Sequence, residues 1–238
     1  MEFVLFPNVI MYHLAIRSIL LGLLLISVPA FADDPDQAPS SGRSGGGRGC
    51  GTAMPSQSDV PSIILLAPQG AKQTVLTRPT FVWYVRDAAP MEFRLYAQTE
   101  DNRYQLIKQE QLQSSPGIMV MTLNQTTPEL AIGKYRWQVV LVCDRDRPSS
   151  NLFATSEIEV VRLPRELKTR LEQTRDPMSQ ASIYAEANLW YDALGTAISS
   201  SIRKTALKDS RLALLDKMGL SNTEQRLLQE STIQPIQP

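Results

Sequence analysis

Between residues 61 and 163 apolar and polar residues alternate, which is the pattern of strands with one buried face. Thr80–Val85 carries a large apolar residue at every second position, and Glu92–Ala97 alternates in the same way. A period of two places successive side chains on opposite faces of a strand. Seven strands are expected, at Ser62–Ala67, Thr80–Val85, Glu92–Ala97, Tyr104–Lys108, Ile118–Leu123, Lys134–Cys143 and Phe153–Val161. Turn residues separate these strands at the spacing of an antiparallel, immunoglobulin-like β-sandwich, which we expect over residues 50–163.

Beyond residue 163 the apolar spacing lengthens to three or four residues, which is the period of helices. Helix signals occur at Pro164, at Asp176 and Pro177, from Trp190 to Ile202, from Leu212 to a stop at Gly219, and at Ser221 and Glu224, which fit a capping box. We therefore expect an α+β chain that is mainly β. A small C-terminal helical unit over residues 164–231 follows the sandwich, and residues 232–238 form a disordered tail.

The N-terminal part has the pattern of a secretory signal peptide. A ten-residue apolar run, Ile19–Val28, follows His13 and Arg17 and precedes the small residues Ala30 and Ala32. This order of charged, apolar and small residues predicts cleavage after Ala32, so that residues 1–32 are removed. The run is shorter than the roughly 20 residues of a membrane-spanning helix, so a retained anchor is the less favoured alternative.

Cleavage leaves a chain that begins with a tether. Residues 33–49 are rich in Pro, Ser and Gly and contain no large apolar residue, so they predict a flexible linker. The translation start fits either Met1 or Met11, and the sequence leaves that choice open. We expect the mature protein in the periplasm or outside the cell, with no later segment long enough to span a membrane.

The composition limits the chemistry that the mature chain can perform. The 24 basic and 24 acidic residues are interleaved, which gives no electrostatic argument for nucleic acid binding. His13 is the sole histidine of the chain and is lost with the signal peptide. A Ser-His-Asp triad, zinc bound by histidine and the usual general base are thereby excluded. We expect a protein that is not an enzyme and that holds no metal or cofactor, although lysine or carboxylate catalysis is not excluded.

Two cysteines, Cys50 and Cys143, are present in the chain. Exported chains meet oxidising conditions, so an even cysteine count predicts a disulfide, here between Cys50 and Cys143. Two unpaired thiols are the alternative. The alternation in Lys134–Cys143 places Cys143 on the core face, so the bridge would attach the end of the linker to the sandwich.

Three further groups are candidate sites. Asp144 and Asp146 place two carboxylates in one loop, but Arg145 and Arg147 interleave with them, which favours a solvated, internally paired loop over calcium binding or acid–base work. All three tryptophans of the chain lie on the predicted inward stripes of their elements: Trp83, Trp137 and Trp190. This position indicates core packing rather than a sugar-stacking platform. Tyr84 and Tyr96 fall on the opposite faces of their strands, so we expect them to take part in surface recognition.

Several segments together resemble a known family. They are Gly47–Thr52, Leu65–Gly70, Arg78–Val85, Glu92–Tyr96, Pro116–Leu123, Gly133–Asp144 and Tyr184–Leu194, in this order. The chain from about Gly47 to Leu220 resembles a cyanobacterial family of exported proteins described as domain of unknown function 928. The resemblance implies an envelope location and two cysteines, and it implies no activity and no catalytic residues. Tyr184–Leu194 also resembles the turn between the helices of a tetratricopeptide repeat.

The sequence favours a binding protein over an enzyme. The first hypothesis is an exported envelope binding or scaffold protein, with a protein partner that docks near Tyr84 and Tyr96 or on the helices. The alternative is a module that binds carbohydrate or an envelope polymer, which rests on fold analogy. The third hypothesis is a hydrolase that uses Asp144 and Asp146. The ligand, the pathway and the oligomeric state are left open.

Overall fold

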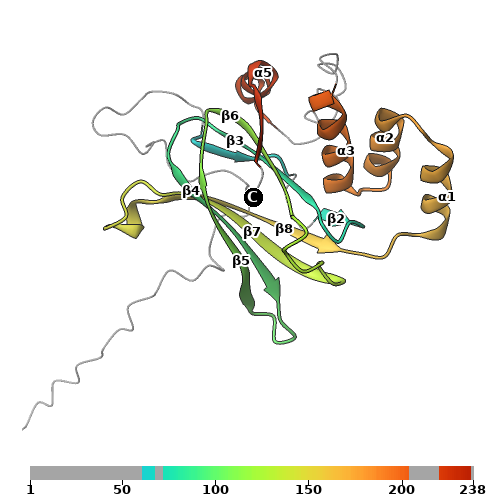
Figure 1. The fold of residues 1–238 in the computed structure, drawn as a ribbon, viewed down its shortest axis with the longest axis horizontal. Coiled ribbons are helices and arrows are strands. Elements are labelled where there is room, and N and C mark those ends of the chain that lie inside the picture. Colours follow the sequence, from blue (N-terminus) through green and yellow to red (C-terminus); the bar gives the residue numbers. More distant parts are fainter. Residues whose placement is uncertain (1–60, 68–71, 204–219, 237–238) are drawn as a thin grey trace, which may run out of the picture. The chain divides into compact units, whose positions relative to one another are not determined.

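Two mixed β-sheets and four helices make up the part of the chain that the structure describes, so the protein is mainly β. The computed structural model describes residues 61–67, 72–203 and 220–236, with only the backbone of residues 201–203 (Figure 1). Several predictions lie outside these residues: the signal peptide with Ala30 and Ala32, the linker, Cys50, and the helix at 212–218.

The strands and helices follow one another in an order close to the predicted one. The strands are β1 (Ile63–Leu65), β2 (Lys72–Thr74), β3 (Thr80–Val85), β4 (Pro90–Gln98), β5 (Tyr104–Gln113), β6 (Gly117–Thr122), β7 (Gly133–Leu141), β8 (Leu152–Val160) and β9 (Ile233–Ile236). The helices are α1 (Arg165–Gln173), α2 (Pro177–Glu186), α3 (Trp190–Arg203) and α5 (Asn222–Glu230), with a short 3₁₀ turn, η2 (Pro148–Ser150).

The seven predicted strands are all present, but the expectation of a purely antiparallel fold is wrong. The four-stranded sheet has the order β1-β3-β6-β9, and the five-stranded sheet has the order β2-β8-β7-β4-β5. β2 pairs with β8, and β9 pairs with β6, in parallel. Both exceptions are short edge strands that come from distant parts of the chain, so hairpin turns do not fix their direction. The immunoglobulin-like and tetratricopeptide-like similarities stay predictions.

The two sheets face each other across an aromatic core. Phe81 of β3 lies 5.0 Å, between ring centroids, from both Phe93 of β4 and Trp137 of β7. Trp83 and Trp137 are fully buried in this cluster, so the prediction that they pack in the core is confirmed. Such aromatic pairs add attraction to the apolar area that they bury.

Helices α2, α3 and α5 cover the other face of the four-stranded sheet. Tyr84 and Val82 of β3 pack there against Trp190 and Leu194 of α3 and Leu228 of α5. Tyr84 is consequently only 5% exposed, and its expected role in surface recognition is wrong. The alternation placed Tyr84 correctly on the face away from the inter-sheet core, but the helices make that face a second core.

The helix starts follow the predicted signals. The Asp176 side chain accepts a hydrogen bond from the backbone N–H of Ser179 at 2.8 Å and caps α2. Ser221 and Glu224 form the predicted capping box of α5. Between α2 and α3 the chain reverses at Asn188, which has a positive φ of 60°.

The C-terminal residues differ from the prediction of a disordered tail. Ile233–Ile236 forms β9 along β6, and the backbone N–H of Ile118 donates to the carbonyl of Thr232 at 2.8 Å. Pro235 is tolerated because β9 is an edge strand. The described residues after α5 therefore return to the four-stranded sheet.

Candidate functional site

The outward face of the five-stranded sheet carries the largest group of connected polar side chains that the structure describes. Because side chains alternate along β4, Phe93 and Leu95 enter the core while Glu92, Arg94 and Tyr96 point outward. The neighbouring strands continue the outward rows across the sheet. We call this surface the polar face, which comprises Glu92, Arg94, Tyr96, Tyr104, Gln109, Gln111, Arg136, Gln138, Thr155 and Glu157.

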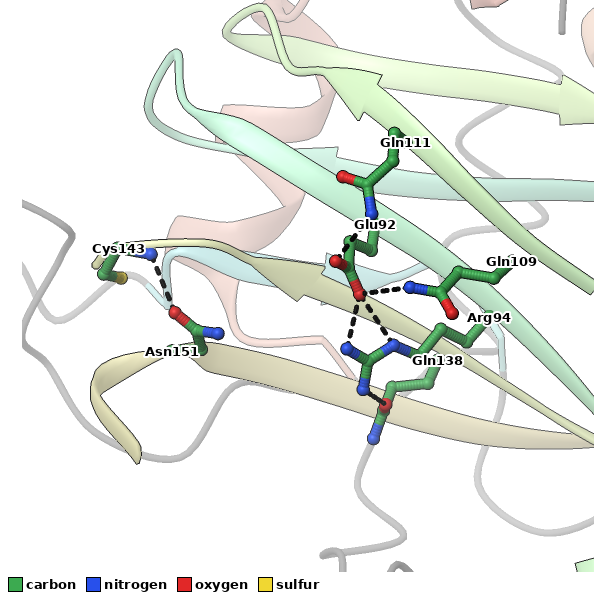
Figure 2. A network of polar contacts seen from close by, with 7 residues as sticks. All are labelled: Glu92, Arg94, Gln109, Gln111, Gln138, Cys143 and Asn151. Atoms are coloured by element: carbon green, nitrogen blue, oxygen red, sulfur yellow. Dashed lines mark hydrogen bonds and ion pairs between the residues drawn. The ribbon is translucent and has the colours of Figure 1, made fainter. Parts of the chain in front are cut away.

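The carboxylate of Glu92 is the centre of one half of the polar face. Its Oε1 accepts a hydrogen bond from Nε2 of Gln111 at 2.7 Å, and its Oε2 accepts one from Nε2 of Gln109 at 3.1 Å (Figure 2). Nε of Arg94 donates to the same Oε2 at 2.8 Å, and Nη2 of Arg94 also contacts it. Three side chains from two strands therefore converge on one carboxylate.

These contacts keep Glu92 ionised. Burial by itself would raise the pKa of Glu92. The hydrogen bonds from Gln111, Arg94 and Gln109, with the positive charge of Arg94, outweigh burial and lower the pKa below its usual value. Glu92 is therefore a hydrogen-bond acceptor at neutral pH, and it is poorly suited to donate a proton to a substrate.

Glu92 also fixes the orientation of two amides. An ionised carboxylate only accepts hydrogen bonds, so Gln109 and Gln111 must turn their NH₂ groups toward it. Their carbonyl oxygens consequently point away from Glu92, as Figure 2 shows. Because the charges of Glu92 and Arg94 neutralise each other, this part of the polar face offers neutral acceptors to a ligand.

The network extends across the sheet from Arg94. Nη1 of Arg94 donates to Oε1 of Gln138 on β7 at 3.5 Å. Nε2 of Gln138 in turn donates to Oγ1 of Thr155 on β8 at 3.3 Å. The polar side chains of four strands, β5, β4, β7 and β8, are thus linked by hydrogen bonds and held in defined positions.

The other half of the polar face is built around an arginine stacked on a tyrosine. The guanidinium carbon of Arg136 lies 3.7 Å from the ring centroid of Tyr104, a cation–π contact. Glu157 accepts from the Tyr104 hydroxyl at 3.1 Å and pairs with Arg136 at 3.3 Å. Burial and the charge of Glu157 raise the pKa of Tyr104. Tyr96, half-buried, lies beside Arg136 in the strand register.

The predicted surface residues do not form one site. Tyr96 belongs to the polar face, whereas Tyr84 lies in the other sheet beneath the helices. Gln109 and Gln111 were missed because the predicted strand ended at Lys108, although glutamine recurs at positions 109, 111 and 113. That recurrence is the signal that would have extended the strand and placed both amides on one face.

The loop after β7 is internally paired, as the interleaved charges suggested. Asp144 accepts from the backbone N–H of Asp146 at 2.9 Å and from Nε of Arg147 at 2.9 Å. Within the described residues no group of three His, Cys, Asp or Glu side chains is arranged to hold a metal ion. The Asp144 carboxylate therefore serves the conformation of the loop itself, and Asp146 contributes its backbone N–H.

Cys143 lies just beyond the end of β7. Its backbone N–H donates to Oδ1 of Asn151 at 3.0 Å (Figure 2), which ties the two ends of the loop together. Cys50 lies outside the described residues, so its pairing with Cys143 stays a prediction. In the described segments no helix is both long and apolar enough to cross a membrane.

The fold and the polar face together define a class: a mainly β protein of two mixed sheets, with helices on one sheet and a hydrogen-bonded polar surface on the other. Residues 43–228 match the family model described as Domain of Unknown Function (DUF928), and the chain belongs to this family. The predicted resemblance is thereby confirmed. No curated protein matches the chain.

Proposed function

We propose that the chain is an exported protein-binding module of the cell envelope, whose partner docks on the polar face beside strand β5. The observation that supports this proposal best is the convergence of Gln109, Gln111 and Arg94 on Glu92. A surface whose side chains are already held in place loses less entropy when a partner binds. Its neutral acceptors match the backbone N–H groups and polar side chains of a protein.

Strand β5 adds an edge that an extended partner segment can use. β5 has ten residues and ends the order of the five-stranded sheet. An extended peptide can pair with such an edge and place its side chains against the adjoining face. A register shift between Leu95 and Tyr96, and the ion pair of Lys108 and Glu110 on the core side of β5, oppose indiscriminate pairing between copies. These features favour a specific partner.

Site-specific photo-crosslinking in living cells tests this proposal. A photoreactive amino acid in place of Gln111 should give a discrete adduct with an envelope protein, which mass spectrometry identifies. The matched control replaces Gln229, an exposed glutamine of α5. Glu92→Gln should lower the adduct yield from position 111 several-fold, because it releases Gln109 and Arg94, the two partners of Glu92 that remain when Gln111 is replaced.

The same pattern of adducts from positions 111 and 229 would contradict docking on the polar face. So would an adduct yield from position 111 that Glu92→Gln leaves unchanged while the folded protein is present at its normal level. Either result would mean that a partner docks elsewhere on the protein, or that no partner docks at all.

Export is the second part of the proposal and has its own test. Mass spectrometry of the protein from the envelope fraction should find Asp33 at the N-terminus and a Cys50–Cys143 crosslink. An intact N-terminus in the cytosol, together with two free thiols, would overturn both export and the disulfide.

Binding of carbohydrate or another envelope polymer is the alternative function. The acceptor oxygens of Gln109 and Gln111, with the aromatic residues Tyr96 and Tyr104 on the same face, favour it because sugars offer hydroxyl donors and apolar ring faces. Tryptophan fluorescence is a poor probe here, since Trp83, Trp137 and Trp190 are all buried. Co-sedimentation with insoluble envelope polymer, lost in Gln111→Ala, is the appropriate test.

A further inference from the structure

Three exposed aliphatic residues lie in the segments that leave or enter one end of the five-stranded sheet. Leu76 is 42% exposed, Ile132 is 58% exposed and Leu163 is 37% exposed. Isolated apolar residues on a surface are ordinary, whereas a group of them marks an interaction site. We call these three residues the aliphatic patch.

The strand register places the three residues together. Val160 of β8 is paired with Thr74 of β2 on one side and with Gly133 of β7 on the other. β2 and β8 run parallel, so Leu76 and Leu163 leave the sheet in the same direction. β7 runs the opposite way, so Ile132 precedes it at that same end. Neighbouring strands are about 4.8 Å apart, which keeps the three segments adjacent.

Backbone contacts reinforce this arrangement. The N–H of Val161 donates to the carbonyl of Thr74 at 2.9 Å, and the N–H of Leu130 donates to the carbonyl of Thr77 at 2.9 Å. Val75 and Val161 pack against the helical residues Leu167 and Leu171. The segments are therefore anchored by Val75 and Val161, while Leu76 and Leu163 remain at the surface.

Three cations neighbour the aliphatic patch along the chain. Lys134, Arg162 and Arg165 are exposed and close to it in the chain. Among the described residues none of these three cations forms an ion pair. Of the acidic groups nearby, Glu129 pairs with Arg78 at 2.7 Å. Glu159 accepts from the neutral amide of Gln73 at 3.1 Å and keeps its charge opposite Lys134 in the register, so it offsets part of the positive charge. Glu166 on α1 offsets part of the remaining positive charge.

We propose that the aliphatic patch and its three cations form a docking surface for an anionic lipid membrane. Aliphatic side chains enter the boundary between headgroups and acyl chains, and cations beside them bind the phosphate groups. A lipid surface adapts to exposed side chains at the end of a sheet, whereas a protein partner requires a complementary surface of its own. This contact is peripheral and distinct from the polar face, so it does not depend on the proposed protein partner.

Vesicle co-sedimentation tests the proposal with the protein as expressing cells process it, purified from their envelope. Vesicles of phosphatidylglycerol and phosphatidylcholine in equal parts should bind the protein more tightly than pure phosphatidylcholine. The neutral vesicles measure any binding by an apolar N-terminal segment. Higher salt should weaken the anionic binding, because it screens the cations.

Substitutions in the patch should remove this preference. Ile132→Ser and Arg162→Glu are each expected to weaken binding to the anionic vesicles about tenfold. The matched controls are Phe153→Ser and Arg145→Glu, which make the same kinds of change toward the opposite end of β7 and β8. Both controls should bind as the unaltered protein does. All four sites are exposed, and thermal unfolding checks that each variant is folded.

Two results would overturn the lipid assignment. One is equal binding to the anionic and neutral vesicles, and the other is an equal loss of binding in the patch variants and their controls. A photoreactive residue at position 132 that yields a protein adduct, in the absence of vesicle binding, would assign the patch to a protein instead. Because this site lies apart from Gln111, each outcome is independent of the crosslinking result on the polar face.

Discussion

Two tryptophans in the same aromatic cluster differ in one respect, the hydrogen bonding of the indole N–H. Nε1 of Trp137 donates to the hydroxyl of Tyr191 at 2.8 Å, and that hydroxyl donates to the carbonyl of Glu157 at 3.1 Å. Nε1 of Trp83 is buried and has no hydrogen-bond partner. A buried donor without an acceptor costs about 1–3 kcal/mol. Trp83 is therefore the less favourable of the two residues, although both are fully buried.

Replacing each tryptophan by phenylalanine isolates this difference. Trp137→Phe should lower the free energy of unfolding by about 1–3 kcal/mol more than Trp83→Phe does, because only Trp137 loses a hydrogen bond and only Trp83 sheds an unsatisfied donor. Urea unfolding measures both values. The two variants lose the same side-chain volume from one cluster, so equal destabilisation would contradict the expected difference between the bonded and the unbonded indole N–H.

Asp192 is a second buried residue with a measurable consequence. Its side chain is inaccessible to solvent and accepts from the backbone N–H of Val75 at 3.3 and 3.2 Å. Burial raises the pKa of Asp192 to about 6, although hydrogen bonds from Thr74 and Val75 lower it in part. The folded chain therefore holds a proton on Asp192 at a pH where the unfolded chain has released it.

The contribution of Asp192 to stability should consequently fall as the pH rises from about 4 to about 6, and stay constant above that range. The expected size of the fall is about 2–3 kcal/mol, at 1.36 kcal/mol for each unit of pKa difference. Asp192→Asn keeps an acceptor oxygen and removes the titration. The measurement is the difference in unfolding free energy between the two proteins across this pH range, and a difference that does not vary with pH would contradict the assignment.

The burial of single residues could be predicted from the sequence in some places and not in others. The stripes that place Trp83, Trp137 and Trp190 in cores depend only on the local period, and they are confirmed. Tyr84 was assigned to the correct face, but the period of a strand does not say what covers that face. Tyr191 and Asp192 lie off the main stripe of α3, so an amphipathic helix predicts that they are exposed. Both are buried because α3 also contacts the core between the sheets and the segment just after β2.

Among the elements, β9 lies beside β6 at a point where the two segments approach closely. Gly117 begins β6 with a φ of +129°, and a Cβ at this position would lie 2.7 Å from the carbonyl oxygen of Thr232. The missing side chain thus allows the chain after α5 to approach β6. Sequence reasoning missed β9 because four residues with a proline carry little strand signal, and the pairing partner is more than 100 residues away.

Gly117→Ala should therefore detach β9. We expect it to lower the free energy of unfolding by about 1–3 kcal/mol more than Gly133→Ala does. Gly133 also has a positive φ, +155°, but a Cβ there meets nothing within 4 Å, so the pair of variants separates the steric clash from backbone strain. Hydrogen exchange of the Ile118 amide, which donates to Thr232, should accelerate in Gly117→Ala alone. Unchanged exchange at Ile118 would show that β9 tolerates the added methyl group.

The polar face could be predicted only in part. The outward position of Glu92, Arg94 and Tyr96 follows from alternation along one strand. The convergence of Gln109 and Gln111 on Glu92 depends on the register between β4 and β5, which residue types along a single strand do not specify. The same limit applies to the aliphatic patch, since its three residues are brought together by the pairing of β2 with β8.

For the whole molecule the decisive feature is that α3 anchors the helices to both sheets through three consecutive residues. Nε1 of Trp190 donates to the carbonyl of Leu66, just beyond β1, at 3.2 Å. Tyr191 enters the core between the sheets, and Asp192 holds the segment after β2. The change of apolar period at residue 163 thus marks where strands give way to helices. It does not mark a boundary between separately packed domains, because the helices pack against both sheets.

Shared packing predicts that the helices and the sheets unfold in one transition. Far-ultraviolet circular dichroism reports mainly the helices, and the fluorescence of Trp83 and Trp137 in a Trp190→Phe background reports the core between the sheets. The two signals should change at the same denaturant concentration. Tyr191→Phe should shift both midpoints downward together, because its hydroxyl links Trp137 to Glu157, whereas Arg170→Ala, which removes an exposed ion pair with Glu186, should shift neither. Loss of the helical signal before the fluorescence changes would instead show that the helices are a separate folding unit. The contacts of Tyr191 and Asp192, which this background retains, would then not couple the helices to the sheets.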